Sequence, residues 1–145
     1  MKTVKFFLTA LLALTLSAVC FADDRPIPAD QLPAAAKTFI QKAFPEATIA
    51  YATIDRGFKT EYEVRLSDGS KVEFDASGNW KKVDCEYKAV PESVIPAAIG
   101  QYVKANFPAV PVIKISKKMM GYELELQNDL ELRFSNDGAF LGMDD

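Results

Sequence analysis

The stretch FIQKAFPEATI, Phe39 to Ile49, returns later in the chain as YVKANFPAVPVI, Tyr102 to Ile113, with the Phe-Pro pair in register. The flanking residues repeat as well, so that Ile27 to Asp84 aligns with Val90 to Asp144. Only a three-residue contraction in the loop near Arg56 to Thr60 interrupts the alignment. The chain therefore contains two copies of one structural unit, and this duplication decides its architecture.

Each copy opens with a predicted helix. Apolar residues recur at three- and four-residue spacing, which is typical of a helix with one buried face. We expect N-caps at Asp30 and Ser93, because short polar side chains can accept hydrogen bonds from the free amides of a first turn. Proline suits the start of a helix and also stops one. Such prolines begin and end both predicted helices: Pro33, Pro45, Pro96 and Pro108.

Four strand-like segments follow each helix. TEYEVRLS and YELELQ alternate apolar with polar residues, the period-two pattern of a half-buried antiparallel strand. Asp68-Gly69 predicts a tight hairpin, since Asp-Gly accepts the positive φ that such turns need. The second copy has Asn128-Asp129 at this place, which leaves its hairpin type open.

One repeat of about 55 to 60 residues buries too little apolar surface to be stable by itself. The sequence therefore predicts an α+β fold in which two tandem helix-plus-four-strand repeats form an antiparallel sheet of about eight strands, with two helices on one face. We expect residues 23–84 to be the first repeat, residues 85–89 a linker and residues 90–145 the second repeat.

Residues 1–22 predict a signal peptide, because Lys2 and Lys5 precede an apolar run that ends in small residues, with cleavage after Ala22. A membrane anchor is a weaker alternative, since charged residues follow the run at once. A lipoprotein attached through Cys20 is another, although Val19 is larger than the residue such processing usually needs. We expect a periplasmic or secreted protein with no membrane partner after signal removal.

Without this segment, 15 basic residues stand against 20 acidic ones, a net charge of about −5. The basic residues are not clustered, which argues against nucleic acid as a partner. Cys85 is then alone in the chain. It is either a small buried hydrophobe or, alternatively, a reactive thiol or one half of an intermolecular disulfide.

The repeat pattern resembles the beta-lactamase-inhibitor-like, PepSY-like family of exported bacterial proteins. The resemblance rests on AFPEA and NFPAV at the helix ends, on YEVRLSDGSKVEFDASGNW, and on the hydrophobe-Pro pair that opens each helix, and it covers roughly Ile27 to Asp145. The second copy departs by having Phe140 in place of Trp80. The resemblance implies a fold like the beta-lactamase inhibitor protein, whose curved sheet meets a partner, and kinship with PepSY domains associated with peptidase regulation. It supplies no catalytic motif.

The chain contains no histidine, which excludes Ser-His-Asp and Cys-His catalysis and histidine-ligated zinc. It also has no glycine-rich phosphate loop and no paired-cysteine motif. Chemistry with two carboxylates stays open, but carboxylates that alternate with core residues are usually the solvated side of a strand. We predict that the protein is not an enzyme, with no catalytic residues and no cofactor.

The charged side of the predicted sheet is the candidate binding surface, and its residues are Glu61, Glu63, Arg65, Lys71, Glu73, Glu123, Glu125, Glu131 and Arg133. Trp80 is a candidate aromatic anchor, or else packs in the core. DASGN and SNDG carry oxygen ligands that suit calcium, but a full calcium loop with a terminal glutamate is missing. The same residues form hairpins, and we predict no metal site.

The predicted function is that of an exported non-enzymatic protein-binding module, for example an inhibitor or regulator of an exported enzyme such as a peptidase. Its contacts would be the charged sheet face and the hairpin tips Asp68-Gly69, Ser77-Gly78 and Asp137-Gly138. The partner would be an unknown exported protein. The alternative is a periplasmic small-ligand or ion-binding protein, which requires a pocket between sheet and helices.

Overall fold

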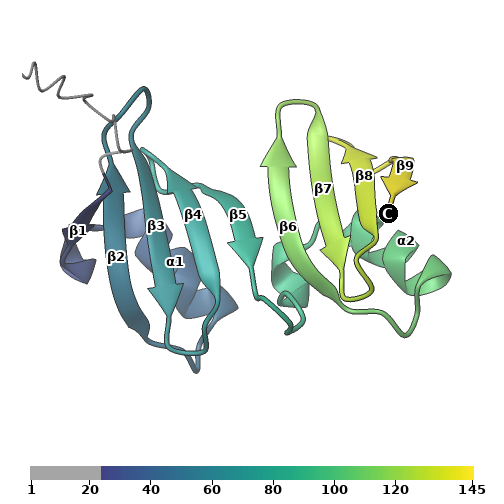
Figure 1. Cartoon of the computed structure of the whole chain (residues 1–145), viewed down its shortest axis with the longest axis horizontal. Coiled ribbons are helices and arrows are strands. Elements are labelled where there is room, and N and C mark those ends of the chain that lie inside the picture. The colour runs from purple at the N-terminus through teal and green to yellow at the C-terminus, as the bar shows by residue number, and fades with distance from the viewer. Residues whose placement is uncertain (1–23) are drawn as a thin grey trace, which may run out of the picture.

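The computed structural model describes residues 24–145, which form two helices and one nine-stranded sheet (Figure 1). The predicted signal peptide, its cleavage after Ala22 and the state of Cys20 lie outside the described residues. All neighbouring strands are antiparallel, and their order in the sheet is their order in the chain. The strands are β1 (Arg25–Ile27), β2 (Ile49–Asp55), β3 (Glu61–Leu66), β4 (Lys71–Asp75), β5 (Trp80–Asp84), β6 (Val112–Lys118), β7 (Gly121–Leu126), β8 (Glu131–Ser135) and β9 (Phe140–Asp144).

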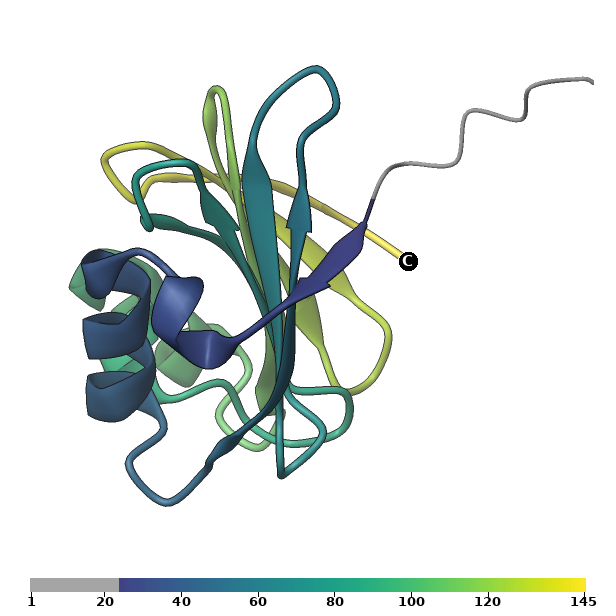
Figure 2. The same ribbon diagram turned by 90° about the vertical axis from the view of Figure 1, so that its left-hand side faces the viewer.

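Both helices lie on one face of the sheet, as predicted (Figure 2). Helix α1 spans Ala34–Ala43 and α2 spans Ala97–Asn106. Between them and the sheet is one continuous core, to which the alternating apolar strand residues contribute. Burying each large apolar side chain stabilises the fold by about 1.5 to 3 kcal/mol. The fully buried members on strands β3 to β8 are Val64, Leu66, Val72, Phe74, Val83, Ile115, Leu124, Leu126, Leu132 and Phe134.

The helices begin later than the sequence predicts. Asp30 and Ser93 are not N-caps but belong to short 3-10 helices, η1 (Ala29–Gln31) and η2 (Glu92–Val94). Leu32 and Ile95 follow in extended conformation, because each precedes a proline and proline disfavours helical geometry in the residue before it. The α-helices can therefore start only after these prolines, and neither has a side-chain cap.

The helix ends agree with the sequence. The amides of Phe44 and Phe107 donate the last helical hydrogen bonds, to the carbonyl oxygens of Ile40 at 2.8 Å and Val103 at 2.7 Å. A proline follows each phenylalanine and has no N–H with which to continue the helix. The repeated Phe-Pro pair thus marks the same helix exit twice.

Strand β1 is the difference between the eight strands expected and the nine found. Its Ile27 lies opposite Ala52 of β2, as Val83 of β5 lies opposite Ile115 of β6 in the second repeat. The segment before η1 therefore covers the outer edge of the first repeat as β5 covers that of the second. Its three residues include a proline, which is too short and irregular a signal for period-two analysis.

The two hairpins that follow β3 and β7 have the same turn despite different residues. Gly69 adopts a φ of 89°, and Asp129 adopts a φ of 69° at the corresponding position. Their amides donate to the carbonyl oxygens of Leu66 and Leu126, each at 3.0 Å. Aspartate tolerates the left-handed region better than most residues, so the replacement keeps the hairpin type that the sequence left open.

The hairpin tips at Gly78 and Gly138 bend toward the helices and not toward the polar face. A Cβ added to Gly78 would lie 2.8 Å from Cβ of Pro33, and one added to Gly138 would lie 2.8 Å from Cβ of Ala98. Both glycines also have φ near 85°, a left-handed conformation. These tips therefore close the core at the helix N-termini and are not free contact points.

We expect Gly78→Ala to lower the free energy of unfolding by about 1 to 3 kcal/mol, because the methyl group adds both a clash and backbone strain. Gly57→Ala is the matched control: Gly57 is exposed and has no positive φ. Urea unfolding of both variants would measure the difference. Equal stability of the two variants would show that the tip does not pack on the helix.

Candidate binding surface

All nine predicted surface residues lie on the sheet face opposite the helices, on strands β3, β4, β7 and β8. They alternate along each strand with buried core residues, which places them together on the other side. Most are half-buried by their neighbours, whereas Glu131 and Arg133 are exposed. We call this set, with the partners described below, the charged face.

In the first repeat, Lys71 holds two glutamates that the register brings together. Glu63 lies directly opposite Glu73, an arrangement in which like charges repel. Lys71 belongs to the next cross-strand pair on this face. Its Nζ atom lies 3.7 Å from Glu63 and 3.9 Å from Glu73. This cation offsets the repulsion, so the position of each side chain depends on the other two.

In the second repeat Glu125 lies opposite Glu131, and Lys114 pairs with one of the two, Glu125. The ammonium of Lys114 also lies 3.9 Å from Asp84 across the junction of the repeats. The hydrogen bond to Glu125 raises the pKa of Lys114 against the opposing effect of burial, with further contributions from Asp84 and Glu131. Lys114 therefore remains charged and connects the two halves of the surface.

Further ion pairs continue the charged face toward its margins. Arg65 donates to Glu86 at 3.1 Å and to the carbonyl oxygen of Gly69 at 3.0 Å. Hydrogen bonding to the Tyr51 side chain, and then to Glu86, raises the pKa of Arg65 although burial opposes the shift. The other pairs are Glu61 with Lys81, Glu123 with Lys118 and Arg133 with Asp144.

Sequence analysis missed the contribution of the first and fourth strands of each repeat. Lys81, Asp84, Lys114 and Lys118 all belong to the ion-pair network, yet none is in the predicted set. In β6 the signal is weak: Lys114 and Lys118 have the even spacing of one strand face, but Ser116 between them is buried and Lys117 is exposed. In β5 a register shift between β4 and β5 obscured it.

Trp80 lies on the helix side of the sheet, opposite Phe74, and is half-buried. Its ring centroid is 6.2 Å from that of Phe39 on α1, and Nζ of Lys117 lies 4.0 Å from its ring centroid. Phe140, its counterpart, stacks on Tyr102 of α2 with centroids 4.6 Å apart. Trp80 is thus at the margin of the core and not on the charged face.

The DASGN loop uses its aspartate to hold its own backbone. One carboxylate oxygen of Asp75 accepts hydrogen bonds from the amides of Ser77 and Asn79, both at 2.9 Å. Although burial alone would raise the pKa of Asp75, these bonds lower it. Within residues 24–145, no group of three or more acidic, histidine or cysteine side chains is arranged to hold a metal ion.

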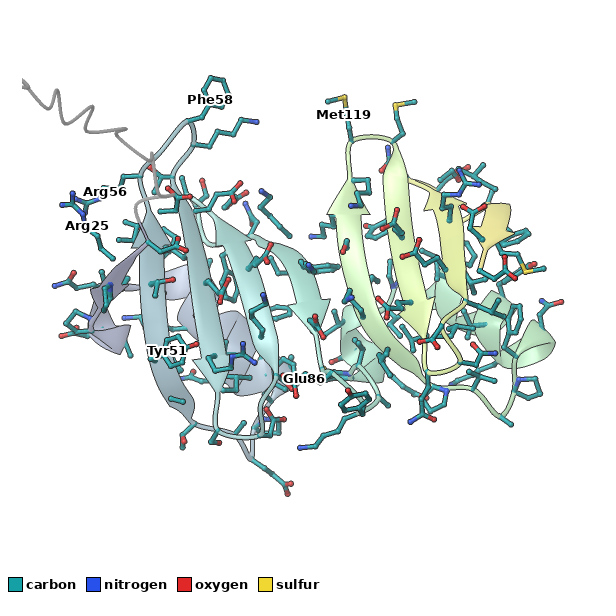
Figure 3. All side chains as sticks on the ribbon, in the orientation of Figure 1. Arg25, Tyr51, Arg56, Phe58, Glu86 and Met119 are labelled. Atoms are coloured by element: carbon teal, nitrogen blue, oxygen red, sulfur yellow. The ribbon has the colours of Figure 1, made fainter. Side chains whose placement is uncertain are left out.

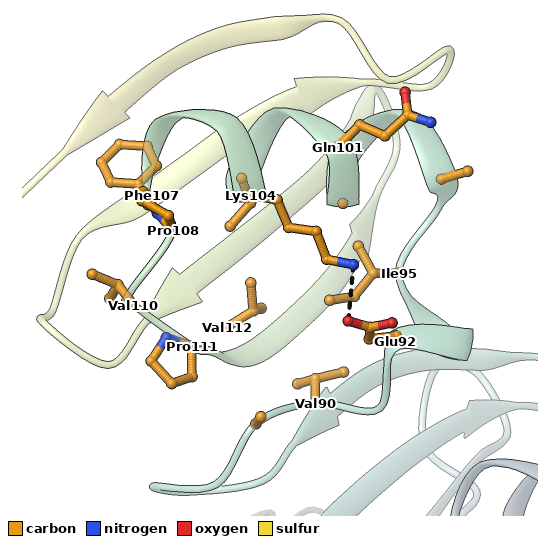
Figure 4. A pocket seen from close by; sticks show the side chains of 14 residues that line it. Val90, Glu92, Ile95, Gln101, Lys104, Phe107, Pro108, Val110, Pro111 and Val112 are labelled. Carbon is orange, nitrogen blue, oxygen red and sulfur yellow. Dashed lines mark ion pairs between the residues drawn. The ribbon is translucent and has the colours of Figure 1, made fainter.

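An apolar cavity of about 380 Å³ lies between α2, η2 and β6 (Figure 4). Val103, Phe107 and Val112 line it, and an ion pair of 3.0 Å between Lys104 and Glu92 lies at its rim. The first repeat has a corresponding cavity of about 400 Å³ lined by Ile40 and the Phe44-Pro45 pair, among others. The helices therefore leave a similar space beside the sheet in both repeats.

The fold and the charged face together define an α+β protein of two tandem repeats, with helices on one side of its sheet and a polar surface on the other. The chain belongs to the family described as "Putative beta-lactamase-inhibitor-like, PepSY-like", whose model matches residues 22–64 and again residues 60–142. The double match agrees with the internal duplication. A search of curated proteins finds no match.

Solved structures from Bacteroides resemble the chain over nearly their whole length. A "putative periplasmic protein of unknown function" from Bacteroides vulgatus has 39% identity and a TM-score of 0.81, over 84% of this chain and 99% of that one. A "putative calcium-regulated periplasmic protein" from Bacteroides thetaiotaomicron has 40% identity and a TM-score of 0.82, over 85% and 98% of the two chains.

These similarities assign the protein to the periplasm or the secreted fraction, as the sequence predicts. No helix among residues 24–145 is long and apolar enough to cross a bilayer. Neither the family description nor these structures identify a catalytic residue or a partner.

Cys85 is 3% exposed, and burial raises the pKa of its thiol. We therefore expect its thiol to react slowly with a disulfide reagent in the native protein and quickly once the chain is unfolded, since only an accessible thiolate attacks. Absorbance of the released thiolate, with and without guanidinium, measures this. Rapid native labelling, or a dimer that dissociates on reduction, would contradict it.

Proposed function

We propose that this chain is a non-enzymatic protein-binding module that restrains or regulates an exported enzyme, for example a peptidase, through its charged face. The observation that carries the proposal is the set of ion pairs on the sheet face of both repeats, including those of Arg65 and Lys71 in the first and of Lys114 in the second. The pair between Lys114 and Asp84 crosses the junction of the repeats. The family description, with its inhibitor-like component, agrees with a protein partner.

The network supports binding because it fixes the charges before a partner arrives. Lys71 and Lys114 each lie between carboxylates and have little freedom to lose on association. Charges in fixed positions favour a partner of complementary pattern and reject others. Exposed ion pairs contribute only about 0 to 1 kcal/mol to stability, so we attribute their regular arrangement to recognition.

The hairpin tips have a smaller part in this proposal than the sequence suggests. Ser77-Gly78 and Asp137-Gly138 pack on the helices. Only the tip at Asp68-Gly69 remains beside the charged face, where Arg65 binds the carbonyl oxygen of Gly69 and Lys88 binds that of Asp68.

A second candidate function is that of a small-ligand or ion-binding protein. The cavity beside α2 favours it, because it is largely apolar, has a charged pair at its rim and is of the size that small ligands occupy. The description of the Bacteroides thetaiotaomicron relative as calcium-regulated brings calcium into the set of ions to be tested.

The combined substitution of Glu63, Arg65, Glu123 and Glu125 by alanine tests the charged face. We expect capture of a partner from periplasmic extract to fall at least about tenfold, with little change in thermal stability, because solvent-accessible pairs contribute little to folding. Quantitative pull-down with mass spectrometry, followed by titration of the identified partner, measures the effect.

The matched control is the pair Lys42→Ala and Gln101→Ala, two exposed helix positions on the opposite side of the molecule. This control should capture the partner as the unmodified protein does. Unchanged capture by the quadruple variant would exclude the charged face as the contact surface.

For the second function, a panel of apolar metabolites and calcium should raise the unfolding temperature if one of them binds. Gly100→Met tests the cavity, because a Cβ at Gly100 would lie 3.8 Å from Ile95 and has room to extend. The unfolding temperature of Gly100→Met should no longer rise when an apolar ligand is added. Lys37→Met, at the corresponding place in the first repeat, should still show the rise. An unaltered response in Gly100→Met would exclude this cavity as the site.

A further inference from the structure

Two corresponding hairpins carry the two most exposed large apolar side chains of residues 24–145, Phe58 and Met119. Phe58, between β2 and β3, is 99% exposed, and Met119 and Met120, between β6 and β7, are 94% and 77% exposed. Figure 3 shows that both hairpins project from the same end of the strands. We call them the β2–β3 tip (residues 56–60) and the β6–β7 tip (residues 117–120).

The two tips reach the same composition with different residues. The first reads RGFKT and the second KKMM, so each has a large apolar apex beside basic side chains. The chain as a whole is acidic, with a formal net charge of −3. Neither packing nor turn geometry requires Phe or Met at an apex in water, whereas single exposed hydrophobes elsewhere need no explanation.

Two of the four basic residues at the tips, Arg56 and Lys59, are available to an external anion. No ion pair among the described residues engages Arg56 or Lys59. Lys117 lies over the ring of Trp80, and Lys118 pairs with Glu123 at 3.6 Å near the base of its tip. Figure 3 shows the Arg56 side chain below Phe58, beside Arg25.

The acidic residues near these tips lie farther from the apices, at the ends of the strands. Three of these carboxylates already have partners in the fold: Asp55 accepts the amide of Gly57 at 2.7 Å, Glu61 pairs with Lys81, and Glu123 pairs with Lys118. Each tip therefore combines an apolar apex with basic residues, and three nearby carboxylates have partners in the fold. This combination suits a membrane surface, where acyl chains lie beneath anionic phosphates.

We propose that the two tips dock the protein on the surface of a bilayer that contains anionic phospholipid. Phe58, Met119 and Met120 enter the boundary between headgroups and acyl chains, while Arg56 and Lys59 bind phosphates. Two separated apices can reach one flat surface at the same time, which favours a membrane over a concave protein site. This proposal departs from the sequence expectation of no membrane partner, and it needs no spanning helix.

The start of the described chain lies at the same end of the strands as the two tips. Asp24 lines a shallow polar depression with Asp55 and Glu61, and Arg25 lies opposite Ile54 near the end of β2. The described chain therefore begins on the side that carries the two tips. The strands would stand upright on the lipid, which leaves the charged face open to the surrounding compartment.

Vesicle co-sedimentation tests the proposal, with residues 23–145 in every protein, so that neither the apolar segment before Asp23 nor Cys20 contributes to binding. We expect binding to phosphatidylcholine vesicles that contain phosphatidylglycerol, weaker binding without it, and a loss as ionic strength rises. The triple variant Phe58→Ser, Met119→Ser, Met120→Ser should bind at least about tenfold more weakly, because its apolar insertion is gone. Arg56→Gln with Lys59→Gln should reduce the preference for phosphatidylglycerol.

Tyr87→Ser is the matched control. Tyr87 is 82% exposed, but it follows β5 at the opposite end of the strands from the two tips. It should bind vesicles as the unmodified protein does. Phe58→Trp combined with Trp80→Phe provides a direct reading: the fluorescence of its single tryptophan should shift to the blue on phosphatidylglycerol vesicles and be quenched by brominated acyl chains.

Absence of vesicle binding, or equal binding by the triple variant, would overturn the proposal. The same holds for tryptophan fluorescence at residue 58 that does not respond to vesicles. If the triple variant instead loses capture of a protein while the unmodified chain ignores vesicles, the tips belong to a protein interface and the lipid assignment is wrong.

Discussion

The pairing of β5 with β6 is the interaction on which the rest of the structure depends. It places Val83 opposite Ile115, both fully buried, and is extended by backbone hydrogen bonds from Cys85 to Ile113 and from Val90 to Val112. Without this junction each repeat would expose the edge of its core, and a unit of this size buries only about 60% of its unfolded surface. The same pairing brings Asp84 within reach of Lys114, so the junction also makes the charged face continuous.

The two repeats share their buried residues and helix ends but differ at exposed positions. The Phe-Pro helix exits and the inner strand residues serve the same packing in both repeats. Positions outside the core differ: Gly69 corresponds to Asp129, and the single apex Phe58 corresponds to Met119 and Met120. Burial constrains size and shape, whereas an exposed position is constrained only by what it contacts. The differences between the repeats are therefore informative about function, and the apolar character kept at both tips is the least expected of them.

The edges of the sheet show how local patterns can mislead. The three residues of β1 gave no period-two signal, yet they cover the edge of the first repeat. Asp30 and Ser93 satisfied the composition of an N-cap, but the extended residue before each proline moved the helix start beyond them. Period-two alternation nevertheless placed all nine predicted charged residues on one face, because side-chain direction in a strand follows from the backbone alone.

The sequence by itself determined the repeat, the helix exits, the alternation of the strands and the absence of histidine chemistry, since each depends on residues close in the chain or on composition. Only the tertiary structure decided which charges meet, that Trp80 lies on the helix side, and that two hairpins bend to the helices while two others project. These features depend on register across strands and on contacts between distant segments. A cross-strand neighbour is fixed by how the whole sheet assembles, and no local pattern encodes it.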